Sequence, residues 1–178
     1  MSVLSFPRRL AMGDMGICLR KRVHRHDAAV VRRITDSSGF FCTEEVEVAV
    51  ELVQTRLARG TASGYFFLFA DADPPVGQTV GYSCFGPIAC TQASFDLYWI
   101  AVLDRYRGIG LGNLLIAQSE RLIQGMGGGR IYVETSSRGQ YEPTRHFYTG
   151  RGYSQQACIP DFYAPGDGKI IYVKELLK

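Results

Sequence analysis

A glycine-rich stretch over residues 107–113, with the sequence RGIGLGN, constrains this chain more than any other segment. It follows the apolar, β-branched run 95–102 and opens a pattern of leucines at helical spacing. A strand, a short glycine turn and a helix N-terminus in that order create an anion site. Glycines let the backbone approach a ligand, and the unpaired N–H groups of the helix favour phosphate oxygens. The stretch therefore predicts a phosphate-bearing ligand, with a glycine turn that binds nothing as the alternative.

Two common phosphate-binding motifs do not fit this stretch. A P-loop requires a Lys-Ser or Lys-Thr pair after its glycines, whereas Gly112 is followed by an Asn-Leu pair. A dinucleotide fingerprint starting at Gly108 and Gly110 would place its third glycine at Asn113. The pattern that fits is Arg-x-x-Gly-x-Gly, formed by Arg107, Gly110 and Gly112.

A second segment, FYTGRGY over residues 147–153, follows further along the chain. A strand pattern over residues 131–135 lies between the two segments. In this order, the segments resemble the acetyl-coenzyme A signature and the Phe-Tyr-x-x-x-Gly-Tyr/Phe segment of the GNAT superfamily of N-acetyltransferases. The resemblance extends from about Cys18 to Lys174.

Length and composition favour one globular domain. The chain has 178 residues, of which 46% are hydrophobic and 21% charged. We expect residues 17–178 to form a GNAT-like domain. Residues 1–16 mix Gly, Met, Pro and Arg without periodicity, so we expect a loose leader there. A net charge of +3, with no basic stretch interleaved with aromatics, argues against nucleic acid as a partner. No apolar run approaches a membrane span, so no membrane partner is expected.

Cysteine and histidine usage argues against disulfides and metals. The five cysteines are odd in number, scattered and without a Cys-x-x-Cys pair, which is typical of reduced residues in a cytoplasmic protein. The three histidines show no metal-ligand spacing, so no metal cofactor is expected.

Apolar periodicity predicts the order of helices and strands. Asp27 and Thr43 are expected to cap the first two helices. Two final strands, 153–159 and 169–176, are expected to be separated by a loop over residues 160–168. With the resemblance, this order implies the fold class α/β (α+β). The expected architecture is a single-domain, mixed and mostly antiparallel central sheet, flanked by helices, whose strands part at the acetyl-CoA site.

The resemblance implies acetyl-coenzyme A as co-substrate. Its pyrophosphate would bind the glycine turn, and its pantetheine arm would pair with the strand before that turn. The matching positions are Ile100, Ala101, Val102, Arg107, Gly108, Ile109, Gly110, Leu111 and Gly112. Many members also carry an Asn that bonds the arm seven residues before the catalytic Tyr. Here that position is Tyr141, whose ring could pack against the arm without the amide contact.

The resemblance assigns the proton for the leaving thiolate to Tyr148. An unperturbed phenol, with a pKa of about 10, is protonated at neutral pH. The attacking amine must be neutral, and Glu134 and Asp96 are the carboxylates on the strands that flank the expected gap. We assign the substrate-side role to Glu134. Either carboxylate could instead orient a cationic acceptor or face solvent.

The expected activity is acetyl transfer to a small-molecule or peptide amine by direct attack in a ternary complex. Phe40, Phe41 and the segment 161–163 are candidate acceptor-pocket residues. A hydrophobic clamp between helices is the favoured interpretation of the two phenylalanines, and a polar turn that of residues 161–163. Two other classes stay open: a non-catalytic acyl-CoA sensor of the same fold, and a different nucleotide-binding α/β protein. A homodimer is suggested by the superfamily alone.

Overall fold

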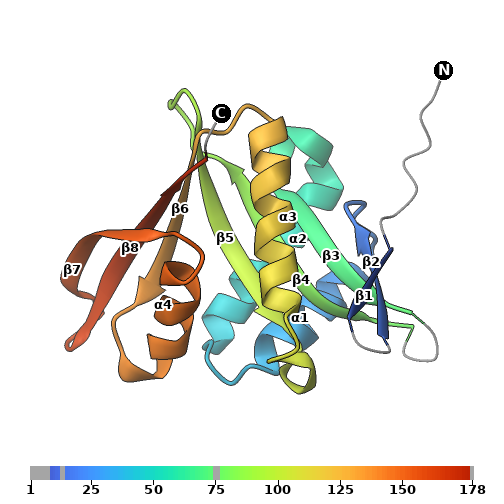
Figure 1. The fold of residues 1–178 in the computed structure, drawn as a ribbon, viewed down its shortest axis with the longest axis horizontal. Helices are drawn as coiled ribbons and strands as arrows, with labels where there is room; N and C mark the ends of the chain where they lie inside the picture. Colours follow the sequence, from blue (N-terminus) through green and yellow to red (C-terminus); the bar gives the residue numbers. More distant parts are fainter. Residues whose placement is uncertain (1–8, 13–14, 74–76, 177–178) are drawn as a thin grey trace. The chain divides into compact units, whose positions relative to one another are not determined.

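The computed structural model describes residues 9–12, 15–73 and 77–176. These residues divide into two compact units. The first contains the described chain up to Cys84 together with Trp99–Ser119, and the second contains Phe85–Tyr98 and the described chain from Glu120 onward. The elements (Figure 1) are β1 (Arg9–Met12), β2 (Met15–Arg20), α1 (Asp27–Asp36), α2 (Thr43–Arg59), η1 (Gly60–Ser63), β3 (Phe66–Ala72), β4 (Thr79–Pro87), β5 (Ser94–Val102), η2 (Asp104–Tyr106), α3 (Leu111–Gly125), β6 (Arg130–Ser136), η3 (Gly139–Tyr141), α4 (Glu142–Thr149), β7 (Ser154–Ala164) and β8 (Asp167–Glu175).

The eight strands follow the order β1-β2-β3-β4-β5-β6-β8-β7. The pairs β1·β2, β2·β3, β6·β8 and β7·β8 are antiparallel, whereas β5·β6 is parallel. The parallel ladder runs only from Ser94↔Arg130 to Asp96↔Tyr132, although both strands continue beyond it. The prediction of an α+β fold with a mixed, mostly antiparallel sheet is confirmed.

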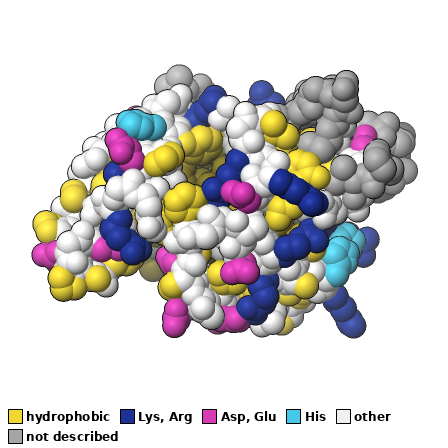
Figure 2. All heavy atoms as spheres, turned by 90° about the horizontal axis from the view of Figure 1, so that it is seen from below, with side chains coloured by type: hydrophobic (Ala, Val, Ile, Leu, Met, Phe, Trp, Pro, Cys, Tyr) yellow, Lys and Arg dark blue, Asp and Glu magenta, His cyan; other side chains and the backbone are white. Residues whose placement is uncertain are grey.

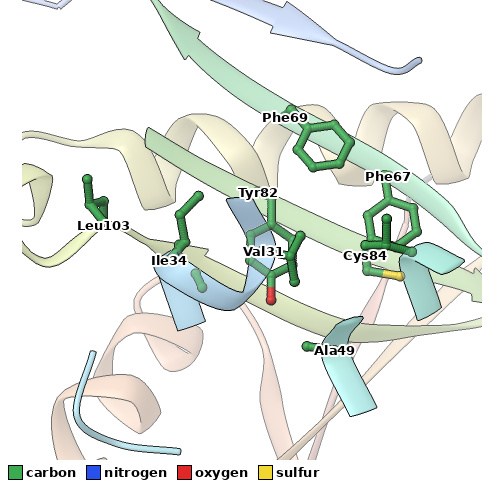
Figure 3. Close-up of a cluster of buried hydrophobic side chains, with 10 residues drawn as sticks. Val31, Ile34, Ala49, Phe67, Phe69, Tyr82, Cys84 and Leu103 are labelled. Carbon is green, nitrogen blue, oxygen red and sulfur yellow. The ribbon is translucent and has the colours of Figure 1, made fainter. Parts of the chain in front are cut away.

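In the first unit, α1 and α2 pack against β3 and β4 around a buried cluster (Figure 3). Tyr82 lies at its centre, and its hydroxyl is 2.7 Å from the hydroxyl of Thr35 in α1. Residues of β4 that alternate with Tyr82 face α3 instead. The Ser83 hydroxyl is 2.7 Å from that of Ser119, and a Cβ added at Gly81 would lie 3.1 Å from Leu115. The first unit thus carries helices on both faces of β4.

We predicted that Asp27 caps α1, and this prediction is wrong. Asp27 is the first residue of the helix, and His26 precedes it without a side-chain cap. The Asp27 carboxylate is fully buried, where it accepts hydrogen bonds from the His24 amide at 2.7 Å and from Arg20 at 2.8 Å. The Asp27 carboxylate thus binds the Arg20 guanidinium and the His24 amide, and links the start of α1 to β2.

The cap of α2 also lies one residue earlier than predicted. Cys42 is the N-cap, and Thr43 is the first helical residue. Glu45 completes a capping box by accepting a hydrogen bond from the Cys42 amide at 2.8 Å. The Cys42 thiol therefore occupies the N-cap position, where a Ser or Thr hydroxyl is more common.

In the second unit, β5, β6 and β8 present one buried and one half-exposed face. Ile131 and Val133 alternate with Tyr132 and Glu134, and only the first two are buried. Tyr172 of β8 lies on the buried face, where its ring contacts Tyr148 of α4. The side-chain alternation therefore separates an apolar face under α4 from a polar face.

Two predictions of irregular structure are wrong in part. Within the expected leader, Arg9–Met12 forms β1 and pairs with Met15–Cys18 in register, because a hairpin supplies backbone partners that the composition does not reveal. The expected loop over 160–168 belongs largely to β7 and β8. Asp161 adopts φ 53° and accepts a hydrogen bond from the Gly166 amide at 2.6 Å. The pairing of β7 with β8 is irregular between Ile159 and Ala164, and the turn-forming residues lie in this irregular part of the hairpin.

Candidate functional site

The glycine turn between β5 and α3 has the backbone that the sequence predicts. Gly108 and Gly110 have φ of 75° and 92°, which side chains other than hydrogen disfavour. The Gly110 carbonyl accepts the first helical bond, from the Leu114 amide at 3.0 Å. Within the described chain, no N–H group from Gly108 to Asn113 donates a backbone hydrogen bond. These N–H groups stay available to an anion at the positive end of the helix dipole.

Arg107 lies at the start of this turn with its guanidinium held on two sides. It is 3.5 Å from the Asp104 carboxylate and 5.1 Å from the centroid of the Phe40 ring. The side chain stays partly exposed, so it can neutralise phosphate charge at the turn. Phe40, a candidate pocket residue, therefore contacts the arginine of the turn.

The last residues of β5 differ in burial. Ala101 is buried in the cluster of Figure 3, whereas Ile100 and Val102 are half-buried. Trp99 contacts Phe41 edge to face at 4.8 Å. Phe41 thus packs against the Trp99 ring of β5.

Tyr148 lies on α4 with its ring buried among aromatic neighbours. It contacts Tyr153 at 5.5 Å and Tyr172 at 6.1 Å between ring centroids. Burial raises the pKa of the Tyr148 phenol well above its ordinary value. In the described part of the chain, the Tyr148 hydroxyl forms no hydrogen bond, so its proton is available to a ligand.

A hydrogen-bond network that the sequence did not predict holds the entry to α4. Asp167, buried at the start of β8, accepts from Ser136 and pairs with Arg138 at 2.9 Å. Arg145 of α4 donates to the carbonyls of Ser136 and Arg138 at 3.0 and 2.9 Å. No local pattern connects residues so distant in sequence. Tyr141 lies within this segment, with its ring buried and the Arg138 guanidinium 5.9 Å above it.

Asp96 and Glu134 lie on the half-exposed face of the second unit. Glu134 is half exposed and pairs with Lys169 at 2.7 Å. Asp96 has no hydrogen bond or ion pair within the described chain. Burial, and then the charge of Glu134, raise the pKa of Asp96, while Lys169 acts in the opposite direction. The residues we predicted as alternatives therefore form one electrostatic group.

Other surface features are formed by residues that we did not predict for the site. An open hollow of about 430 Å³ in the first unit is lined by Arg33, Ser37, Gln78, Leu103, Asp104 and Arg105, none of them a predicted site residue. Figure 2 shows acidic, basic and apolar side chains interspersed on one face.

Over the described residues, no cluster of three or more His, Cys, Asp or Glu side chains could hold a metal ion. No helix in that part of the chain could span a membrane.

The mixed sheet with one short parallel pair and the glycine turn before α3 are features that the sequence leads us to expect of an acyltransferase. The family profile described as "Acetyltransferase (GNAT) domain" matches residues 63–155. A Desulfovibrio desulfuricans protein assigned to the GNAT family is 43% identical, with a TM-score of 0.86 over 89% of this chain and 98% of that one. The chain therefore belongs to the GNAT family of acetyltransferases.

More distant structures share the fold alone. An aminoglycoside 6'-N-acetyltransferase complexed with coenzyme A is 17% identical, with a TM-score of 0.69 over 90% of this chain and 97% of that one. The PaiA N-acetyltransferase of Thermoplasma acidophilum, in complex with coenzyme A, is 18% identical, with a TM-score of 0.67 over 90% and 99% of the two chains. No curated protein matches the chain.

Proposed function

We propose that this enzyme transfers an acetyl group from acetyl-coenzyme A to a primary amine by direct attack within a ternary complex. Its membership of the GNAT family and the coenzyme A complexes of two proteins of the same fold support this reaction. The observation that carries the proposal is the Tyr148 hydroxyl, which has no hydrogen-bond partner within the described residues.

The glycine turn is the proposed cofactor site. The N–H groups from Gly108 to Gly112 would bind the pyrophosphate oxygens, and the Arg107 guanidinium would add a positive charge. Backbone groups of residues 100–102 would pair with the peptide-like arm. Tyr141 would pack its ring against the arm, because it lacks the amide that an Asn at this position would offer.

Tyr148 acts as the general acid. The amine nitrogen attacks the thioester carbonyl carbon, the carbon–sulfur bond breaks, and the Tyr148 proton passes to the sulfur. Because burial raises the pKa of Tyr148, the phenol keeps this proton across the physiological range. The phenol is therefore protonated at neutral pH, which a general acid must be before it donates.

A carboxylate accepts the proton that the amine loses. We assigned this role to Glu134 from the sequence, but the ion pair with Lys169 favours Asp96 as the acceptor. Asp96 has no competing partner, and its raised pKa makes it a better base. Glu134 then acts through its charge, which keeps the pKa of Asp96 high.

A thiol-release assay with acetyl-coenzyme A and a panel of amines tests this function. Tyr148→Phe should lower kcat by about 100-fold, a typical contribution of general acid catalysis, and leave coenzyme A affinity unchanged. Tyr172→Phe removes a neighbouring buried hydroxyl and serves as the matched control. Equal kcat values for the wild type and Tyr148→Phe would remove Tyr148 from the mechanism.

A further inference from the structure

The half-exposed face of the second unit carries aromatic and aliphatic side chains that the proposed chemistry does not use. The strand register places Asp96 beside Tyr132, and Glu134 beside Ile171, on this face. Tyr98 follows two residues after Asp96 and is 38% exposed, while Tyr132 and Ile171 are half-buried. Apolar area removed from water contributes about 25 cal/mol per Å². The face can therefore bind the apolar body of a small molecule.

The charges on this face leave one carboxylate uncompensated. The Glu134 carboxylate and the Lys169 ammonium neutralise each other at 2.7 Å. The Lys169 side chain is 14% exposed, and its ammonium lies 3.9 Å from the centroid of the Phe162 ring. Asp96 has no such partner in the described chain. A complementary ligand carries one positive charge.

Lys169 itself indicates which ligand chemistry the face suits. It presents a primary ammonium on an alkyl stem, and that ammonium lies beside one carboxylate and the aromatic rings of Phe162 and Tyr163. Asp96, with Tyr98 and Tyr132 beside it, offers the same combination of groups to a second ammonium.

We propose that the acetyl acceptor is a small monoamine, with one primary ammonium on an aromatic or alkyl body. This inference rests on the proposed function. The ammonium binds at Asp96, and the body packs on Tyr98, Tyr132 and Ile171. A carboxylate on the acceptor would be repelled by Asp96, and a second ammonium would find Glu134 already paired with Lys169.

Three probes separate these acceptor classes: 2-phenylethylamine, phenylalanine, which adds a carboxylate to the same body, and spermidine, which adds cations. We expect kcat/KM for 2-phenylethylamine to exceed both others by at least about tenfold, as one like-charge or unpaired-charge contact costs about 1.4 kcal/mol or more. Tyr132→Ala should raise the KM for 2-phenylethylamine and leave that for acetyl-coenzyme A unchanged. Leu57→Ala, at an exposed apolar residue of α2, is the control.

Calorimetric binding of 2-phenylethylamine, in the presence of coenzyme A, distinguishes failure of this inference from failure of the proposed function. Binding that Tyr132→Ala weakens, without thiol release from any amine, would support the monoamine site and refute acetyl transfer. A preference for phenylalanine or spermidine would refute the monoamine site while acetyl transfer stands. Absence of both binding and turnover with 2-phenylethylamine would also refute the monoamine site.

Discussion

Asp96, Glu134 and Lys169 are three charged residues whose effects on one another can be measured separately. Asp96 has a pKa raised first by burial and then by the charge of Glu134, and Lys169 opposes that rise. The acidic limb of kcat/KM reports the pKa of an essential base in the free enzyme. The position of that limb therefore measures the electrostatics around Asp96.

Glu134→Gln should move the acidic limb of kcat/KM to lower pH. Removing a negative neighbour favours the ionised form of Asp96, so the pKa of Asp96 falls and the base is active in more acidic solution. Lys169→Met should move the limb in the opposite direction. Profiles of both variants against the wild type check this, and two unshifted limbs would show that Asp96 is not the titrating base.

At the scale of elements, two substitutions of similar size but different charge at the start of α3 test whether a pyrophosphate binds there. Gly112 lies in the first turn, where a carboxylate suits the helix dipole but would repel a pyrophosphate. Gly112→Asp should therefore keep or raise the thermal midpoint and weaken acetyl-coenzyme A binding by about tenfold or more, since one such repulsion costs about 1.4 kcal/mol. Calorimetry with Gly112→Asn, a neutral residue of the same shape, is the control. Equal affinities for the Asp and Asn variants would place the pyrophosphate elsewhere.

The hairpin of β7 and β8 makes a different prediction, about packing. A Cβ added at Gly168 would lie 2.7 Å from the Ile159 carbonyl oxygen and 3.3 Å from the Pro160 Cα. Gly168→Ala should lower the free energy of unfolding by about 1–3 kcal/mol, the usual cost of forcing atoms into a packed site. Urea denaturation measures this. Gly139→Ala, where nothing lies within 4 Å of the added Cβ, should change stability little.

The sequence predicted the helices and strands well because their apolar residues repeat with clear periods. It missed features whose cause is a contact between distant residues. Asp27 is the first residue of α1 and not its cap, and its carboxylate binds Arg20 of β2, a contact that the helix pattern does not reveal. Asp161 and the residues after it read as a loop, yet pairing with β8 holds most of them in a strand.

The candidate site was predictable to the same extent. Local motifs indicated Gly110 and Tyr148 as candidate residues from the sequence alone, and their roles stay predictions. Asp167 and Arg145 carry no motif, and only the fold brings them to the segment before α4. The ion pair that distinguishes Glu134 from Asp96 also depends on β8, which lies more than thirty residues further along the chain.

At the scale of the whole molecule, Arg20 is expected to contribute strongly to stability. Its guanidinium joins β2 to α1 through Asp27, and to β3 through Asp71 at 2.8 Å, and it lies 4.4 Å from the Phe69 ring centroid. Asp27 is fully buried, so losing its partner leaves an uncompensated charge. Arg20→Met should lower the free energy of unfolding by about 3–5 kcal/mol.

Chemical denaturation of Arg20→Met checks this value, with Arg130→Met as the control. Arg130 pairs with Glu175 at 3.1 Å, but both side chains are more than half exposed. An exposed pair contributes about 0–1 kcal/mol, so its loss should change stability little. Similar losses for the two variants would contradict the role given to the burial of Asp27.

The strand order β6-β8-β7 has a consequence for how the molecule is made. β8 lies between two strands that precede it in sequence, and it pairs with both. While the ribosome is synthesising the chain, β6 and β7 emerge first and lack their common neighbour. The edge of β6 stays open to other nascent chains until residues up to Glu175 have left the exit tunnel. Slow translation after β7 should therefore expose this unit to aggregation, and rapid completion should protect it.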